Sequence, residues 1–153
     1  MPNKKKWMLH AYTWNWLHIV WGTKNHERIL FKELSEPLYQ FILKKSDEIE
    51  VSVEKLNIQP EHLHLLINLP ANICLSDYTH NIKGSSSFWI NKNEMINSPF
   101  QWQRGYAAFS VSQRELKKVK YYIQNQSQHH KDKSYKSKYE EWKEEYVDRS
   151  KKE

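Results

Sequence analysis

The segment from His62 to Leu69, which reads HLHLLINL, constrains the fold most, because side-chain type alternates along it. In an extended strand, successive side chains point to opposite faces of the sheet. One face of this segment is then entirely aliphatic, whereas the other has His62, His64, Leu66 and Asn68. A core face needs no histidine. The alternation therefore predicts a strand that buries its aliphatic face and presents two imidazoles on the other.

The flanking patterns predict further strands and helices. Alternation and β-branched or aromatic content predict strands over residues 12–21, 51–58 and 100–111. Helical spacing predicts helices over 35–49, with Pro37 in its first turn, over 76–91, and after a capping box of Ser112 and Glu115. This order predicts an α+β, ferredoxin-like (RRM-like) antiparallel sheet with helices on one face, plus a C-terminal helix and a tail helix.

Length and composition bound the class of protein. A chain of 153 residues predicts one domain over 1–153, with a core at about 12–130 and a charged aromatic tail over 131–153. The tail repeats aromatic residues at helical spacing, which favours packing. No apolar run approaches membrane-spanning length, and no leader is evident, so we expect a cytoplasmic protein. The single Cys74, expected to be buried, excludes a disulfide framework.

The charge distribution favours a polyanionic partner. The formal net charge is +6, and residues 71–130 contain seven basic and three acidic side chains. Residues 83–87, KGSSS, are unusual for a helix interior. Small side chains beside Lys83 either let a phosphate backbone approach or form a locally packed face. The sequence leaves both interpretations open.

Two groups of residues are candidates for metal binding or catalysis. His62 and His64 stand side by side on one strand face and can converge on one metal ion, although the pattern alone is weak. In the last predicted helix, Tyr122 and Gln126 lie four residues apart on one flank of the buried stripe. Tyr121 points nearly the opposite way. Helical geometry thus prefers Tyr122 as the tyrosine at the core edge, a place where packing alone also puts tyrosines.

The ordered combination of HLH at 62–64 and YIQNQ at 122–126 resembles the HUH single-tyrosine transposases of the insertion-sequence-200 type. These include the REP-associated tyrosine transposases. Intervening IKGSSS and FQWQRGY segments fall where similar family segments fall, and the similarity covers roughly residues 12–130. Glu61 stands where many relatives have aspartate.

The resemblance implies a site and a reaction. His62, His64 and Gln126 would bind a divalent cation, Mg²⁺ or Mn²⁺, and Tyr122 would attack single-stranded DNA near a hairpin. A 5′-phosphotyrosine intermediate would let the same site rejoin strands. Insertion-sequence members resemble obligate dimers in which the tyrosine helix serves the histidines of the other subunit, so we expect a homodimer. REP-associated members can be monomeric.

Basic, small and aromatic residues are candidates for contacts to the DNA, through phosphates or base stacking. They are Lys83, Ser85, Trp89, Trp102, Arg104, Lys117, Lys118 and Lys120.

Three other functions remain open. A domesticated member could use the same nicking chemistry for another task. A metal-dependent phosphoesterase with a water nucleophile would make Tyr122 a spectator, and it would normally need further ligands, for which the other histidines, His18 among them, show no obvious spacing. A non-catalytic ferredoxin-like module could bind nucleic acid through its sheet aromatics, but it leaves the histidine pair unexplained.

Overall fold

A computed structural model describes residues 11–126. The elements are β1 (Trp16–Gly22), the short 3₁₀ helix η2 (Lys24–His26), α1 (Lys32–Glu48), β2 (Val53–Ile58), β3 (His62–Asn68), α2 (Leu75–Lys92), β4 (Ala107–Ser110) and α3 (Leu116–Gln124). The strands form one antiparallel sheet in the order β2-β3-β1-β4. The predicted α+β, ferredoxin-like architecture is confirmed.

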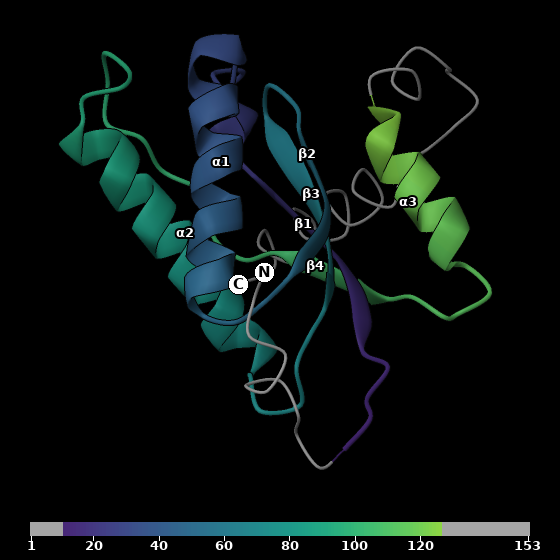
Figure 1. Ribbon diagram of the computed structural model, residues 1–153. Coiled ribbons are helices and arrows are strands. Elements are labelled where there is room, and N and C mark those ends of the chain that lie inside the picture. The colour runs from purple at the N-terminus through teal and green to yellow at the C-terminus, as the bar shows by residue number, and fades with distance from the viewer. Residues whose placement is uncertain (1–10, 127–153) are drawn as a thin grey trace, which may run out of the picture.

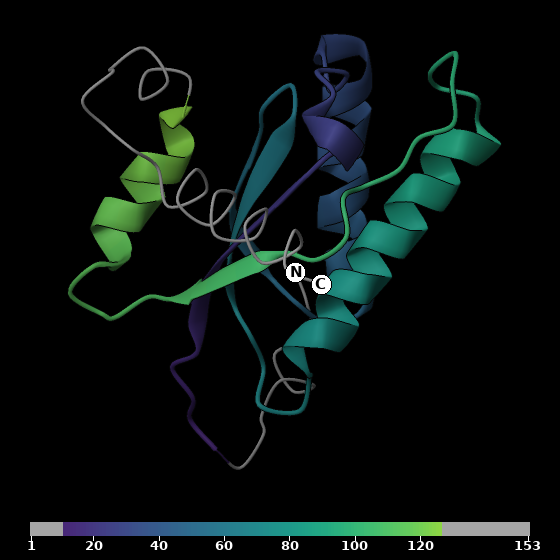
Figure 2. The same ribbon diagram turned by 180° about the vertical axis from the view of Figure 1, so that it is seen from behind.

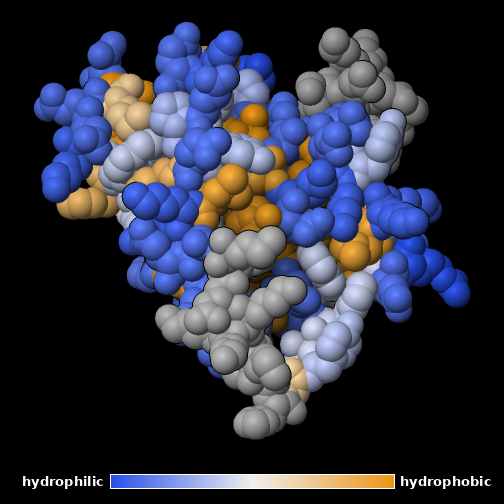
Figure 3. All heavy atoms as spheres, in the orientation of Figure 1, coloured by the Kyte–Doolittle hydropathy of each residue, from blue (hydrophilic) through white to orange (hydrophobic). Residues whose placement is uncertain are grey.

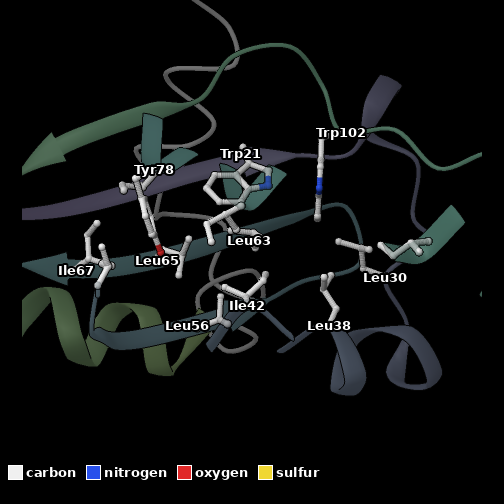
Figure 4. Packing of buried hydrophobic residues seen from close by; sticks show 14 of the residues in the cluster. Trp21, Leu30, Leu38, Ile42, Leu56, Leu63, Leu65, Ile67, Tyr78 and Trp102 are labelled. Carbon is white, nitrogen blue, oxygen red and sulfur yellow. The ribbon is translucent and has the colours of Figure 1, made fainter. Parts of the chain in front are cut away.

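The sheet is covered on both faces. Helices α1 and α2 lie on one face, and α3 lies on the other (Figures 1 and 2). The main core forms between the sheet and the first two helices, where the aliphatic face of β3 meets α1 and α2 (Figure 4). The fully buried residues there include Trp21, Leu38, Ile42, Leu63, Leu65, Ile67 and Tyr78.

A second, smaller core joins α3 to the opposite face of the sheet. Leu66, Val111 and Ile123 form its buried centre, and Tyr122 packs against it. Leu66 belongs to the same face of β3 as His62 and His64. Helix α3 therefore packs on the histidine face rather than extending away from the sheet.

Helix α1 begins earlier than its sequence pattern predicts. The carbonyl of Phe31 accepts hydrogen bonds from the backbone N–H groups of Leu34 and Ser35. The helix therefore begins at Lys32, before the expected start at Ser35. Pro37 consequently lies inside the helix, past its first turn. The missing N–H of Pro37 removes one intrahelical bond, which packing of the buried Leu34 and Leu38 offsets.

The strand expected over 100–111 is interrupted. Its first part pairs with the end of β1, because Gln103 donates its N–H to Gly22 and Lys24 donates to Gln101. Gly105, at φ 79°, then turns the chain in a conformation that favours glycine. Only Ala107–Ser110 forms β4.

The final helix also starts later than expected. Ser112 Oγ accepts the Glu115 N–H at 3.3 Å, as a capping box requires, but residues 113–115 form a turn before α3 begins at Leu116. The first strand likewise begins at Trp16 rather than at residue 12.

The face of the molecule that Figure 3 shows is largely hydrophilic. On the face seen in Figure 3, smaller hydrophobic areas lie between polar side chains. Cys74 is exposed, contrary to expectation, because it precedes α2 in a surface turn. Across residues 11–126 no helix is long and apolar enough to cross a membrane. The expected tail helix lies outside the described residues.

Candidate functional site

The two histidines of β3 face each other on the side of the sheet away from the main core. The Nε2 atom of His62 lies 3.1 Å from Nε2 of His64, and both side chains are buried. Their ring planes are inclined at 74°. Strand alternation thus brings the two imidazoles together, as the sequence predicts, with their Nε2 atoms converging on one point.

Each imidazole has a second partner at its other nitrogen. His62 Nδ1 lies 3.0 Å from Glu61 Oε1, and the other oxygen of that carboxylate accepts a bond from Arg28 at 3.1 Å. His64 Nδ1 lies 2.8 Å from Nε2 of His18 on β1. Such outer partners fix ring orientation and tautomer in metal-binding histidines.

His18 is the residue that sequence spacing missed. The cross-strand register pairs Val20 with His64 and His18 with Leu66, which places His18 diagonally from His64 on the same face. The sequence does contain one signal, since His18 alternates against the apolar Ile19. The register that joins it to β3 is tertiary information.

The imidazole pair fits a divalent cation. Neighbouring ligands at metal–nitrogen distances of about 2.1 Å lie on the order of 3 Å apart in an octahedral or tetrahedral shell. The observed 3.1 Å between the Nε2 atoms of His62 and His64 matches that spacing. Within residues 11–126, no group of three or more His, Cys, Asp or Glu side chains is arranged to hold a metal. Further ligands would have to come from amides, water or substrate.

Tyr122 lies beside the histidine pair of its own chain. Its ring centroid is 5.9 Å from that of His64 and 6.0 Å from that of His18, both edge-on. Tyr121 is 64% exposed on the other side of α3. The packing of Tyr122 in the second core accounts for the difference between the two tyrosines.

Gln126 follows Tyr122 by one helical turn and is buried. Its Nε2 donates to the backbone carbonyl of Tyr122 at 3.1 Å. With the amide nitrogen engaged in this way, the amide oxygen is the atom that could act as a neutral ligand.

The KGSSS segment of α2 lines a groove of about 600 Å³. Lys24, Lys83 and Arg104 supply its positive charge, and Gly84 and Ser87 form its small-residue wall. A Cβ added at Gly84 would meet nothing within 4 Å, so packing does not demand glycine there. Lys24 was not a sequence candidate, because only the folding of the 101–104 loop brings it to α2.

The neighbouring serines show that part of the segment is packed. Ser86 is buried, donates to the Ile82 carbonyl at 2.6 Å and accepts the Trp102 indole N–H at 2.9 Å. Ser85 donates to the same Ile82 carbonyl at 3.4 Å. The packing interpretation of KGSSS therefore holds for Ser86, whereas the approach of a phosphate backbone beside Lys83 stays a prediction.

The two tryptophans that the sequence suggests for base stacking pack against other aromatic rings of the protein. Trp102 is 9% exposed and packs edge-on against Trp21 and Phe100. Trp89 stacks on Phe41 of α1, with ring centroids 4.5 Å apart. Trp102 is therefore held in the core, whereas Trp89 stays partly exposed.

The lysines of α3 differ in their surroundings. Lys117 and Lys118 are exposed. Lys120 pairs with Glu54 of β2 at 2.9 Å and lies over the Trp16 ring. Lys120 thus anchors α3 to the sheet, whereas Lys117 and Lys118 remain exposed among residues 11–126.

Lys83 is held at the groove wall by two backbone carbonyls. Its Nζ donates to Gln103 at 2.8 Å and to Gly105 at 2.7 Å. Partial burial lowers the pKa of Lys83 to about 8. Its ammonium therefore fixes the 103–105 turn and contributes positive charge at neutral pH.

We expect the free energy of unfolding to rise with pH at this group. Between a folded pKa of about 8 and the ordinary value of 10.5, the unfolded chain binds more protons at Lys83, so deprotonation favours the folded state. The wild type should gain stability relative to a Lys83→Met variant as pH rises from 8 to 10.5. Thermal melts of both proteins across this range, with NMR titration of Lys83 Cε, provide the measurement. An NMR titration midpoint for Lys83 near its ordinary value of 10.5 would contradict this expectation.

Comparison with known proteins assigns the chain to a family. The family described as transposase IS200-like matches residues 12–126, which span the fold and every proposed ligand. The chain belongs to the IS200-like transposase family, and the expected resemblance is confirmed. It acts as a transposase. Such transposases are generally metal-dependent.

Individual relatives are similar but distant. The ISDra2 transposase TnpA of Deinococcus radiodurans is 22% identical over 114 residues, covering 71% of this chain and 81% of the relative. A Deinococcus radiodurans crystal structure described as a transposase is 21% identical, with a TM-score of 0.61 over 76% of this chain and 94% of that one. A REP-associated tyrosine transposase, solved with a REP hairpin, is 16% identical, with a TM-score of 0.58 over 76% and 70%. The two structures share the fold.

Proposed function

We propose that this transposase cuts and rejoins single-stranded DNA near a hairpin, with Tyr122 as nucleophile and His62, His64 and Gln126 as ligands of Mg²⁺ or Mn²⁺. The observation that carries the proposal is the position of Tyr122, whose ring lies 5.9 Å from that of His64 in the same chain. Membership of the transposase family and the closeness of Tyr122 to His64 both support this proposal.

The donor set suits phosphoryl transfer. A bound cation would polarise the phosphate oxygens and offset charge that develops on them. Two imidazoles and an amide are neutral ligands, so they leave the cation's charge undiminished, whereas carboxylates would partly cancel it. Glu61 contacts His62 at Nδ1 instead of lying between the two Nε2 atoms.

Tyr122 would then perform the covalent step. Its phenolic proton passes to water, a bond forms between Oη and phosphorus, and the bond from phosphorus to O3′ breaks. The departing O3′ takes a proton and becomes a free 3′-OH, and the DNA remains attached as a 5′-phosphotyrosine. Attack by a 3′-OH reverses these bond changes and restores Tyr122. The phosphodiester energy is conserved, so no ATP is needed.

The groove beside α2 is the proposed path for the DNA backbone. Lys24, which lines this groove, follows Gly22 by two residues, and Gly22 pairs with His62 in the sheet. Lys24, Lys83 and Arg104 would neutralise phosphates there. Lys117 and Lys118 would offer further exposed charge on α3, the helix that also contains Tyr122.

A covalent-trapping experiment tests the proposal. The protein is incubated with labelled single-stranded hairpin DNA and Mg²⁺ or Mn²⁺, then denatured and run on a gel. We expect cleavage with a protein-linked 5′ phosphate and a free 3′-OH. Cleavage without an adduct would favour a water nucleophile, and tight binding without cleavage would favour a binding module. Either result would contradict the proposed chemistry.

The same-chain arrangement bears on assembly. Because Tyr122 lies against its own histidines, the proposed site needs no residue from a second subunit. A homodimer, expected from the likeness to insertion-sequence members, would then serve to hold two DNA ends rather than to complete the site. Sedimentation with and without hairpin DNA measures the oligomeric state.

Gly84→Ala separates the packing and binding interpretations of KGSSS. Glycine disfavours a helix interior, and the added methyl meets open space, so stability should rise by about 0.5–1 kcal/mol. If a phosphate backbone lies in the groove, the same methyl should weaken hairpin binding. Thermal melts and fluorescence anisotropy measure the two effects, with Arg104→Ala as a charge-removing comparison. Unchanged affinity in both variants would remove the groove from the DNA path.

A further inference from the structure

We propose that His18 is a positioning residue for His64 and that His18 Nε2 accepts a hydrogen bond from His64 Nδ1 when a cation binds. This inference rests on the proposed function, since it concerns the same imidazole pair. None of the sequence motifs includes His18, and its side chain is 2% exposed. A histidine buried in that way must be hydrogen-bonded to be tolerated.

The geometry directs His18 toward the far side of the His64 ring. His18 Nε2 lies 2.8 Å from His64 Nδ1, while the Nε2 of His64 faces His62. The two rings are nearly parallel, inclined at 25°, and their centroids are 5.0 Å apart. Phe109 and Tyr122 pack against His18 at centroid distances of 6.0 Å. His18 is therefore held from several sides while it holds His64.

With Glu61 ionised and the three rings neutral, one set of bond directions satisfies these contacts without a cation. The ionised Glu61 carboxylate only accepts, so His62 donates from Nδ1 and accepts at Nε2. His64 must then donate from Nε2 across the 3.1 Å contact, which leaves its Nδ1 as an acceptor. His18 consequently donates from Nε2.

A cation between His62 and His64 would require the lone pair of each Nε2 atom. His62 already presents one. His64 must then carry its proton on Nδ1 and donate a hydrogen bond to His18 Nε2, and His18 must carry its own proton on Nδ1. Each ring keeps one proton, so the hydrogen bond reverses without proton uptake or release. Position 18 therefore needs a side chain that can either donate a hydrogen bond to His64 Nδ1 or accept one from it, and histidine meets that requirement.

Mn²⁺ affinity, measured by electron paramagnetic resonance on the full chain, tests the role of His18. His18→Phe preserves a flat ring but removes the acceptor, and we expect affinity to fall about 10–100-fold. His18→Gln supplies an amide that can turn to donate or accept, so it should recover most of the affinity. His80→Phe, at an exposed position on α2, is the matched control and should bind as the wild type does. Wild-type affinity in His18→Phe would overturn the inference.

Nitrogen NMR on the unaltered chain gives a second test that does not depend on a variant folding. With ¹⁵N-labelled histidine and Zn²⁺ as a diamagnetic probe, the His18 proton should move from Nε2 to Nδ1 on metal addition. Unchanged His18 nitrogen shifts, with His62 and His64 perturbed, would refute the role of His18 alone. If the wild type bound Mn²⁺ no better than a His62→Ala, His64→Ala double variant, the proposed metal site itself would be wrong.

Discussion

Replacing Tyr122 with phenylalanine is expected to abolish the covalent protein–DNA adduct and to reduce strand cleavage on the order of 10³-fold or more, because the attacking oxygen is removed. The ring itself stays, so packing against Ile123 and the β3 face should be retained. Tyr122→Phe should therefore fold with nearly wild-type thermal stability and still bind hairpin DNA. Gel analysis of denatured reactions gives the adduct, and anisotropy gives the binding.

Tyr121→Phe is the matched control for that experiment. It makes the same chemical change one residue away, at a side chain that is 64% exposed on the opposite side of α3. Its adduct yield should equal that of the wild type. An adduct that survives Tyr122→Phe and disappears in Tyr121→Phe would show that Tyr121 is the nucleophile. The proposed role of Tyr122 would then be wrong, and α3 would have to turn on its axis to present Tyr121.

Replacing His64 with alanine should lower Mn²⁺ affinity by more than about 100-fold and remove cleavage, since one of two converging imidazoles is lost. His64 is fully buried and bonded to His18, so part of the effect could arise from a destabilised site. His64→Gln, which keeps a polar side chain in the same space, and thermal melts separate the two causes. A stable variant that lacks metal binding supports direct ligation.

His80→Ala is the control for the histidine substitutions. It removes an imidazole from an exposed turn of α2, outside the site. It should leave Mn²⁺ affinity and cleavage unchanged. Cleavage that persists at wild-type rate in His64→Ala would contradict the role of the imidazole pair, whatever the behaviour of Tyr122.

Local periodicity predicted much of the fold and part of the site. A period of two in β3 was enough to separate His62 and His64 from the aliphatic core face. A period of 3.6 in α3 was enough to separate Tyr122 from Tyr121. The interruption at Gly105 was harder to foresee, because a glycine within an otherwise strand-like segment is compatible with several backbone conformations.

The sequence by itself determined the order of strands and helices, the two faces of β3 and the side of α3 on which Tyr122 lies, because each follows from spacing within one element. The tertiary structure alone decided that His18 meets His64, that Lys24 joins Lys83 in one groove, and that Trp102 is held in the core. These depend on strand register and on the packing of distant segments. Spacing along the chain does not specify either one.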